Sequence, residues 1–182
     1  MILVDWQIKD AVVSMELGIT PFDTYQINPN SYDVRLGKSF IRFGHDDSPL
    51  DPYYMNDVER RSCPFVSEDP VIIMPGECLL AETAETFRIP RYMVACIEGK
   101  SSLARLFLEV HQTGGWIDAG FEGTITLELV NHFNRPIKLT PGMPIGQMVF
   151  HRTYSCSLPY GERKGSKYQG QSGATMSQYH RN

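Results

Sequence analysis

The chain has 182 residues and a formal net charge of −4, with 17 Lys and Arg against 21 Asp and Glu. This length fits one domain with a tail and can bury a full core, and the mild acidity disfavours broad binding to DNA or RNA backbones. No apolar run approaches the ~20 residues of a membrane-spanning helix, and the first residues, MILVDWQIKD, lack the basic and apolar regions of a signal peptide. We therefore expect a cytoplasmic protein without nucleic-acid or membrane partners.

The cysteines are widely spaced along the chain, at Cys63, Cys78, Cys96 and Cys156. They form no C-x-x-C pair, and no H-x-E precedes a P-C-x-x-C segment, so the pattern disfavours the site of a zinc deaminase. We expect four buried free thiols in a reducing cytosol and no metal site built from protein side chains.

The first predicted element is a helix capped by Asp5, with an apolar stripe of Trp6, Ile8, Ala11, Val12 and Met15. Gly18 is placed to end it in a left-handed turn. Beyond this point Pro and Gly recur about every ten residues, a rhythm typical of a β-sandwich or barrel. We predict strands at 32–36, 39–43, 71–74, 78–83, 93–98, 124–131, 137–139 and 147–151.

Two polar segments interrupt this pattern. Residues 44–68 form a long excursion that fits either an ordered loop or a small hairpin. Residues 160–182 are rich in Gly, Ser, Gln and Lys, so they are expected to be poorly ordered alone and suited to fold over a ligand. Their cations and glycines can cradle phosphates, although a solvated terminus explains the same composition.

The segment 99–131 holds most of the polar residues that a core does not need. Ser101, Ser102 and Arg105 share one face of a predicted helical turn, while Leu103, Leu106 and Phe107 are expected to face the core. Two hydroxyls, a helix N-terminus and a guanidinium favour an anion. An N-cap with a surface arginine would give the same pattern.

The next group follows a paired-glycine turn, Gly114-Gly115, which allows close approach of a ligand to the backbone. Asp118 fits a ligand contact or a turn-stabilising role, and Phe121 fits a sugar-stacking or a core position. On the predicted strand that follows, Ile125, Leu127 and Leu129 point to one face and Thr124, Thr126 and Glu128 to the other. Glu128 fits an ordinary exposed position on a sheet or, if this face lines a partly dry cleft after the glycine-rich turn, a proton carrier.

Several blocks in the same order resemble one family across nearly the whole chain: MILVDWQI, INPNSYDVRLG, EGKSSLARLFLEVHQTGGWIDAGFEGTITLELVN, PGMPIGQMVF and SKYQGQSGATMS. This pattern is similar to that of the deoxycytidine triphosphate (dCTP) deaminases, relatives of the trimeric dUTPases. The resemblance implies a mainly β, distorted barrel of jelly-roll type at 1–159, with a short N-terminal helix. It also implies a tail at 160–182 that closes over the nucleotide, and a homotrimer with active sites between subunits.

The resemblance also implies residue roles. Glu128 matches the catalytic glutamate, Ser101 and Arg105 match groups that hold the water and polarise the pyrimidine, and Asp118 matches the residue at the deoxyribose. The other matched nucleotide contacts are Lys100, Ser102, Leu103, Ala104, Phe121, Thr126, Leu127, Gln147, Tyr160, Lys167 and Gln171. A magnesium ion bound through the triphosphate is expected.

One motif bears on the product. Deaminase-only relatives carry Ala-His-Arg where this chain has Gly114-Gly115-Trp116, whereas bifunctional relatives carry Ala-Gly and an aromatic residue. The small Gly115 is expected to leave room for a water at the α-phosphate, with Asp118 orienting it. The resemblance thus favours hydrolysis of dCTP to dUMP, ammonia and diphosphate, supplying dUMP for thymidylate synthesis. The alternatives are a deaminase that releases dUTP, a dUTPase, and a nucleotide-sensing binder without turnover.

Overall fold

The computed structural model describes residues 1–54, 57 and 59–181. Along this part of the chain the elements are α1 (Asp5–Val13), β1 (Gly18–Thr20), η1 (Thr24–Gln26), β2 (Ile27–Asn28), β3 (Ser31–Phe43), β4 (Ser62–Val66), β5 (Val71–Ile73), β6 (Cys78–Arg88), β7 (Met93–Gly99), α3 (Ser101–Ala104), β8 (Leu108–Glu109), β9 (Trp116–Ile117), β10 (Glu122–Asn131), β11 (Ile137–Leu139), β12 (Pro144–Arg152), η2 (Tyr160–Glu162) and η3 (Tyr179–Arg181).

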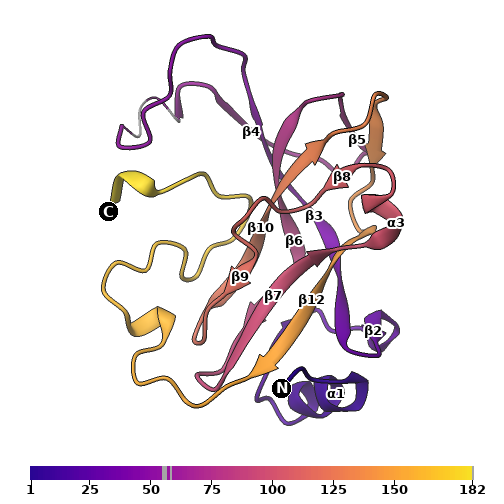
Figure 1. Ribbon diagram of the computed structural model, residues 1–182, viewed down its shortest axis with the longest axis vertical. Coiled ribbons are helices and arrows are strands. Elements are labelled where there is room, and N and C mark those ends of the chain that lie inside the picture. Colours follow the sequence, from indigo (N-terminus) through magenta and orange to yellow (C-terminus); the bar gives the residue numbers. More distant parts are fainter. Residues whose placement is uncertain (55–56, 58, 182) are drawn as a thin grey trace.

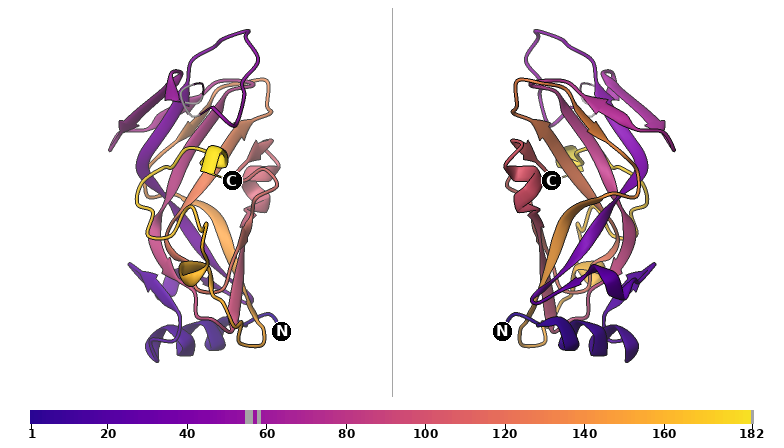
Figure 2. Two further views of the ribbon diagram at one scale, coloured as in Figure 1. Left: turned by 90° about the vertical axis from the view of Figure 1, so that its left-hand side faces the viewer. Right: turned by 90° about the vertical axis from the view of Figure 1, so that its right-hand side faces the viewer.

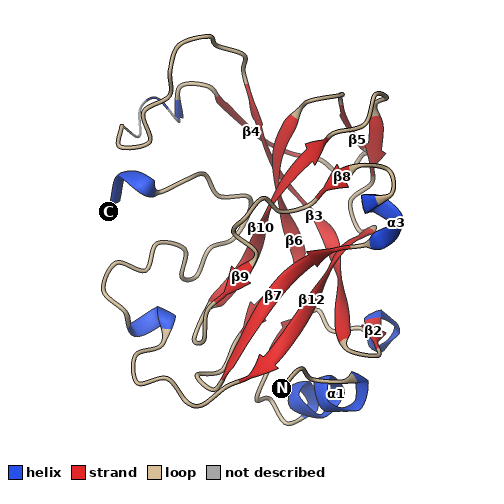
Figure 3. Cartoon of the chain, in the orientation of Figure 1, coloured by secondary structure: helices blue, strands red, loops and turns tan. Residues whose placement is uncertain are grey.

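Within the described residues, ten strands form one sheet with the central order β8-β10-β6-β3-β12-β7-β9. β1 pairs with β6, and β2 and β4 both pair with β3, while β5 and β11 form a separate two-stranded sheet. Figures 1 and 3 show the long strands β3, β6, β7, β10 and β12 running through the body, with α1 at one end. The sheet curls into an open half-barrel that encloses the core (Figure 2), as the mainly β prediction requires.

The core fills the inside of this curl, because alternate residues of each long strand point inward. Tyr32, Phe40, Phe87 and Phe150 are fully buried, and the rings of Phe87 and Phe150 lie 6.5 Å apart. Burying a side chain of this size stabilises the fold by roughly 1.5–3 kcal/mol. The aromatic residues therefore hold β3, β6 and β12 together.

All eight predicted strands are confirmed, but two of them are one strand. The predicted strands 32–36 and 39–43 form the continuous β3, with a register shift against β6 between Leu36 and Phe40. Gly37 does not end a strand: a Cβ there would lie 2.4 Å from the Cγ of Glu82. Glycine is needed because β6 approaches this backbone closely.

The helix is confirmed, but details of its ends and its face were wrong. Val4 is the N-cap and Asp5 lies in the first turn. Ile8 and Ala11 are buried, whereas Trp6 and Met15 are exposed. The left-handed residue is Met15, with φ of 61°, and Gly18 begins β1, so the short helix buries only a narrow stripe.

The expected burial of the four free thiols was also wrong. Cys63 and Cys78 are exposed and Cys96 and Cys156 are half-buried, all as free cysteines. Cys63 lies on β4, which pairs only with β3, and Cys78 begins β6, so both sit at margins of the sheet. Within the described part of the chain, no helix is long and apolar enough to cross a bilayer.

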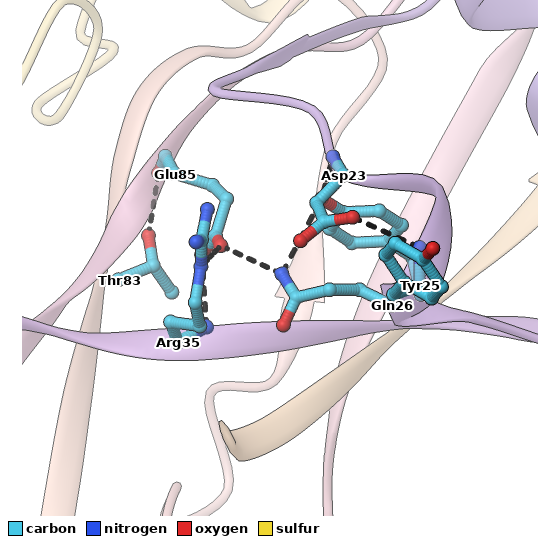
Figure 4. A network of polar contacts seen from close by, with 7 residues as sticks. Asp23, Tyr25, Gln26, Arg35, Thr83 and Glu85 are labelled. Carbon is cyan, nitrogen blue, oxygen red and sulfur yellow. Dashed lines mark hydrogen bonds and ion pairs between the residues drawn. The ribbon is translucent and has the colours of Figure 1, made fainter. Parts of the chain in front are cut away.

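A buried polar cluster joins the N-terminal segment to the sheet (Figure 4). The Glu85 carboxylate, which is fully buried, accepts hydrogen bonds from Gln26 Nε2 at 3.1 Å and from the backbone N and Nε of Arg35 at 2.9 and 2.7 Å. The Glu85 carboxylate raises the pKa of Arg35. β6 continues past the predicted strand 78–83 to Arg88, and Gln26 and Arg35 supply the hydrogen bonds that the buried Glu85 needs in this added part.

Candidate functional site

The candidate site is a pocket of about 690 Å3 between β10, the segment 114–121 and the C-terminal tail. Carboxylate, hydroxyl and amide groups share it with aromatic rings, a combination that suits a ligand with both a ring and polar edges. The pocket is lined by Phe43, Leu50, Pro52, Leu80, Gly114, Trp116, Ile117, Asp118, Phe121, Ile125, Thr126, Glu128, Tyr160, Tyr168, Gln171, Thr175 and Ser177.

Glu128 projects into this pocket from β10. Its Oε2 accepts a hydrogen bond from the backbone N–H of Gln112 at 3.0 Å, and its side chain is half-buried. One oxygen is therefore held by the chain that leads into Gly114, and a Cβ added at Gly114 would lie 3.9 Å from Oε1. A carboxylate fixed in this way can accept a proton from one bound group and return it to another.

The two glycines of the turn occupy different environments. Gly114 is exposed and lines the pocket. Gly115 is buried, and a Cβ there would lie 3.0 Å from the Ile97 carbonyl and 3.1 Å from His111 Nδ1. Its carbonyl also accepts a hydrogen bond from Ile97 N at 2.8 Å. Gly115 thus lets the turn pack against β7, while Gly114 leaves space beside Glu128.

Asp118 and Phe121 lie just after this turn and form one side of the pocket. Asp118 is exposed, and its carbonyl accepts a hydrogen bond from Phe121 N at 3.2 Å. Phe121 is buried, and its ring lies 5.9 Å from that of Tyr160. Phe121 therefore serves both the core and the pocket wall, the two roles that the sequence left open.

β10 brings its residues to the pocket through an irregular register. The pairing with β6 shifts between Thr124 and Thr126. Thr126 and Glu128 line the pocket, as their predicted face requires. Leu127, one of the matched nucleotide contacts, is fully buried in the core, so its side chain does not reach the pocket.

The tail forms the remaining wall, and Tyr160 organises its first half. The Tyr160 hydroxyl accepts hydrogen bonds from the backbone N–H groups of Lys167 and Tyr168, both at 3.1 Å. Gln171 Nε2 donates to the Thr124 carbonyl at 2.7 Å, and Thr124 N donates to the Gln171 carbonyl at 3.1 Å. Tyr160 and Gln171 therefore meet at the pocket as matched, and the tail is folded onto the sheet.

The second half of the tail crosses three adjacent strands. Its backbone N–H groups donate to side chains of β6, β3 and β10 in turn: Gly173 to Glu82 Oε2 at 2.7 Å, Ala174 to Ser39 Oγ at 3.0 Å, and Thr175 to Thr126 Oγ1 at 3.1 Å. The tail, which the sequence predicts to be poorly ordered alone, lies against the sheet, where side chains of three strands supply its hydrogen-bond partners.

The block 100–105 lies elsewhere. α3 has only four residues, and Ser101, Ser102, Ala104 and Arg105 are exposed. Figure 1 shows α3 on the side of the molecule away from the tail, and none of its residues lines the pocket. A single chain therefore does not bring Ser101 and Arg105 to Glu128.

The apolar residues after α3 differ from the prediction. Leu103 packs against the core, but Leu106 and Phe107 are exposed. Phe107 adopts a left-handed conformation, with φ of 58°, and stacks on Phe133 at 5.9 Å. The helix ends at Ala104, so the helical spacing that was used to place these two residues in the core does not apply.

Two groups of hydrogen-bonded side chains hold the start of the segment 99–105 against β2, β3 and β12. The Lys100 Nζ pairs with Asp33 Oδ2 at 2.5 Å, and Asn28 Nδ2 donates to Asp33 Oδ1 at 2.7 Å. Gln147 Nε2 donates to the Gly99 carbonyl at 3.1 Å, and its Oε1 accepts from Ser31 Oγ at 2.8 Å. Lys100 and Gln147, both matched contacts, are thus held together with α3 rather than at the pocket.

Sequence reasoning missed part of both regions. Asn28, Ser31 and Asp33 support Lys100 and Gln147, and the only signal for them was the block INPNSYDVRLG. The pocket also includes residues that no motif singled out as contacts: Phe43, Leu50, Pro52, Leu80, Trp116, Ile117, Ile125, Tyr168, Thr175 and Ser177. Leu50 and Pro52 come from the 44–68 excursion, of which residues 55, 56 and 58 lie outside the described residues.

Within the described residues, no group of three or more His, Cys, Asp or Glu side chains is arranged to hold a metal ion.

Comparison with known proteins bears on this arrangement. Residues 2–153 match the family model described as dCTP deaminase-like. The chain is 50% identical over 182 residues to the dUMP-forming dCTP deaminase of Methanoculleus marisnigri, covering 100% of this chain and 97% of that protein. It is 44% identical over 180 residues to the protein of the same name from Corynebacterium efficiens, covering 97% of this chain and 93% of that one.

Solved structures show the same fold at lower identity. The 2'-deoxycytidine 5'-triphosphate deaminase from Agrobacterium tumefaciens superposes with a TM-score of 0.65 at 24% identity, over 82% of this chain and 46% of that one. A mutant of the dUTPase from phage phi11 of S. aureus gives a TM-score of 0.50 at 14% identity, over 78% and 94%. The family model and the full-length relatives together settle the assignment: the chain belongs to the dCTP deaminase-like family.

Proposed function

We propose that this protein hydrolyses dCTP to dUMP, ammonia and diphosphate. The observation that carries the proposal is the Glu128 carboxylate, held by Gln112 N at 3.0 Å beside Gly114 in a pocket that also contains Thr126 and Asp118. The similarity to dUMP-forming dCTP deaminases, at 44–50% identity over nearly the full length, supports the same reaction.

Deamination needs a proton carrier with two partners. A water adds to C4 of the cytosine ring while Glu128 accepts one of its two protons, and Glu128 then donates that proton to the amino group, which leaves as ammonia. The second proton of the water moves to N3 of the ring as the C4 carbonyl forms. The ring is left as uracil. Charge that develops on the ring needs a fixed cation and donors, and Arg105 and Ser101 are the groups that we assign to this role.

The second half of the reaction breaks the bond between the α- and β-phosphates. A second water attacks the α-phosphorus, its protons pass to solvent and the diphosphate leaves, so dUTP becomes dUMP. We propose that Asp118 orients this water and that the narrow Gly114-Gly115 turn gives it access. A magnesium ion that arrives on the triphosphate would neutralise the leaving diphosphate.

We infer that the working enzyme is a homotrimer whose sites are completed by a neighbouring subunit. Ser101 and Arg105 are exposed on α3, away from the pocket that holds Glu128, so one chain provides only part of the set. Closed cyclic assembly of identical chains brings the same two surfaces together at every interface. The exposed Leu106 and Phe107 beside α3 give such an interface apolar area.

We also propose that the body of the chain and its C-terminal tail have different roles. Residues 1–159 form the catalytic body, and residues 160–182 close over the nucleotide. The contacts of Tyr160 with Phe121, of Gln171 with Thr124 and of Thr175 with Thr126 support this role, because each joins the tail to the body beside the pocket.

The test is product analysis. Purified protein is incubated with dCTP and Mg2+, and nucleotides, ammonia and diphosphate are quantified. Formation of dUMP with one ammonia and one diphosphate per dCTP supports the proposal. Accumulation of dUTP would restrict the activity to deamination, whereas hydrolysis of added dUTP with dCTP left intact would mean a dUTPase. No turnover of either nucleotide would contradict an enzymatic role.

A further inference from the structure

The segment that begins at Gly44 reaches the same pocket as the C-terminal tail. Leu50 and Pro52 line the pocket beside Thr175 and Ser177 of the tail, and Phe43 lines it from the end of β3. The segment therefore supplies an apolar part of the pocket wall. No motif assigns a role to these residues.

One aromatic contact joins the segment to the end of the chain. The rings of Tyr53 and Tyr179 lie 5.1 Å apart with an interplanar angle of 71°, an edge-to-face arrangement. A side-chain hydrogen bond with Tyr179 raises the pKa of the Tyr53 phenol. Both rings remain substantially exposed, at 62% and 43%, so this contact contributes little to the core and mainly joins two surface segments.

The contact continues into the nucleotide-binding part of the tail. The Lys167 Nζ lies 5.6 Å from the centroid of the Tyr179 ring, close enough for a cation–π interaction. Gln178 N, next to Tyr179, donates to the Tyr168 hydroxyl at 3.0 Å. Tyr179 is thus linked to two neighbouring residues, Lys167 and Tyr168, of which Tyr168 lines the pocket.

We propose that the segment 50–53 is part of the substrate site and that Tyr53 is a positioning residue, which holds the closed tail through Tyr179 and thereby fixes Lys167 and Tyr168 at the nucleotide. This inference rests on the proposed function for its substrate but not for its geometry. Since the contact acts on closure rather than on the reacting atoms, its loss should raise KM for dCTP more than it lowers kcat.

The steady-state test compares Tyr53→Ala with Tyr54→Ala, a change to the adjacent tyrosine, which is exposed to 66%. Edge-to-face pairs of this kind predict a rise in KM of about two- to tenfold for Tyr53→Ala. Tyr53→Phe, which keeps the ring, should restore most of the affinity. Tyr179→Ala combined with Tyr53→Ala should raise KM no further than Tyr179→Ala alone, because both remove one contact. Equal effects of Tyr53→Ala and Tyr54→Ala, or additive effects of Tyr53→Ala and Tyr179→Ala, would overturn the proposal.

A second measurement needs no activity. Trypsin cleaves after Lys and Arg, and the tail offers Arg163, Lys164, Lys167 and, next to the last residue, Arg181. Without nucleotide, Tyr53→Ala should be cut at Lys167 faster than the wild type and than Tyr54→Ala, as read from the fragment masses. Equal cleavage rates in all three proteins would contradict the contact. Failure of the wild type to turn over dCTP would instead refute the proposed function and leave this readout intact.

Discussion

The carboxylate of Glu128 is held by the backbone N–H of Gln112, two residues before Gly114. This 3.0 Å hydrogen bond ties the candidate proton carrier on β10 to the segment that leads into the Gly114-Gly115 turn. One oxygen is oriented by the turn, and the other faces the space that a Gly114 side chain would enter. In the proposed reaction, the same loop therefore serves both deamination and the release of diphosphate.

The different packing of the two glycines predicts opposite outcomes for two matched variants. Gly115→Ala places a methyl group 3.0 Å from the Ile97 carbonyl, whereas Gly114→Ala places one 3.9 Å from Glu128 Oε1, an ordinary contact. We expect Gly115→Ala to destabilise the protein by about 1–3 kcal/mol and to increase the share of dUTP among the products. Gly114→Ala should keep the wild-type unfolding temperature. Thermal unfolding and product ratios measure both; a wild-type product ratio in Gly115→Ala would contradict the role of that turn.

The ion pair between Asp33 and Lys100 predicts that a residue outside the pocket affects substrate binding. Asp33→Asn keeps the shape but removes the charge that fixes Lys100 Nζ. If Lys100 contacts the triphosphate, KM for dCTP should rise about five- to thirtyfold, as expected for a charge-assisted hydrogen bond worth roughly 1–2 kcal/mol. Glu68→Gln, which removes the exposed pair between Lys38 and Glu68, is the control and should leave KM unchanged. A normal KM in Asp33→Asn would mean that Lys100 needs no such support.

Separation of Arg105 from Glu128 within one chain predicts recovery of activity by mixing. Arg105→Ala and Glu128→Gln should each be inactive alone. After co-refolding in equal amounts, three quarters of random trimers contain both chains, and each has one intact site of three, so about a quarter of the wild-type activity should return. No recovery, with mixed assembly shown by native mass spectrometry, would place all catalytic groups within one chain.

The buried cluster around Glu85 predicts a stability effect without a direct effect on the site. Glu85→Gln leaves Arg35 without its carboxylate in a buried position, which should cost about 2–3 kcal/mol of unfolding free energy. The exposed ion pair between Lys38 and Glu68 is the matched comparison: Glu68→Gln should lower the free energy of unfolding by less than about 1 kcal/mol. Denaturant unfolding gives both values, and equal values would argue against the importance of burial.

Sequence patterns predicted the strands well because the core depends on local alternation of apolar residues. Glycine positions were less reliable as markers of where helices and strands end. Gly37 lies within β3 because β6 approaches it, and Gly18 begins a strand instead of ending a helix. Both positions depend on contacts with β6, which is distant in the sequence, and not on the neighbouring residues. The same limit explains why a helical spacing placed Leu106 and Phe107 in the core, although α3 ends at Ala104.

The site was predictable where one segment carries it. Asp118, Phe121, Thr126 and Glu128 come from a continuous stretch, and they meet at the pocket. Contacts between distant segments were not predictable: Asp33 with Lys100, Leu50 beside Thr175, and Tyr53 against Tyr179 depend on the folded sheet and on the path of the tail. The family resemblance put Leu127 among the nucleotide contacts, whereas the alternation along the strand already set its side chain opposite Thr126 and Glu128, where it is buried.

The most direct test of the account is ammonia release from dCTP by Glu128→Gln. The variant keeps the size and hydrogen-bonding capacity of the side chain but cannot carry a proton, so we expect ammonia release to fall by at least about a thousandfold. Its circular dichroism spectrum and assembly state should match those of the wild type. Deamination at a wild-type rate by a correctly folded Glu128→Gln would contradict the central claim, because another group would then have to move the proton.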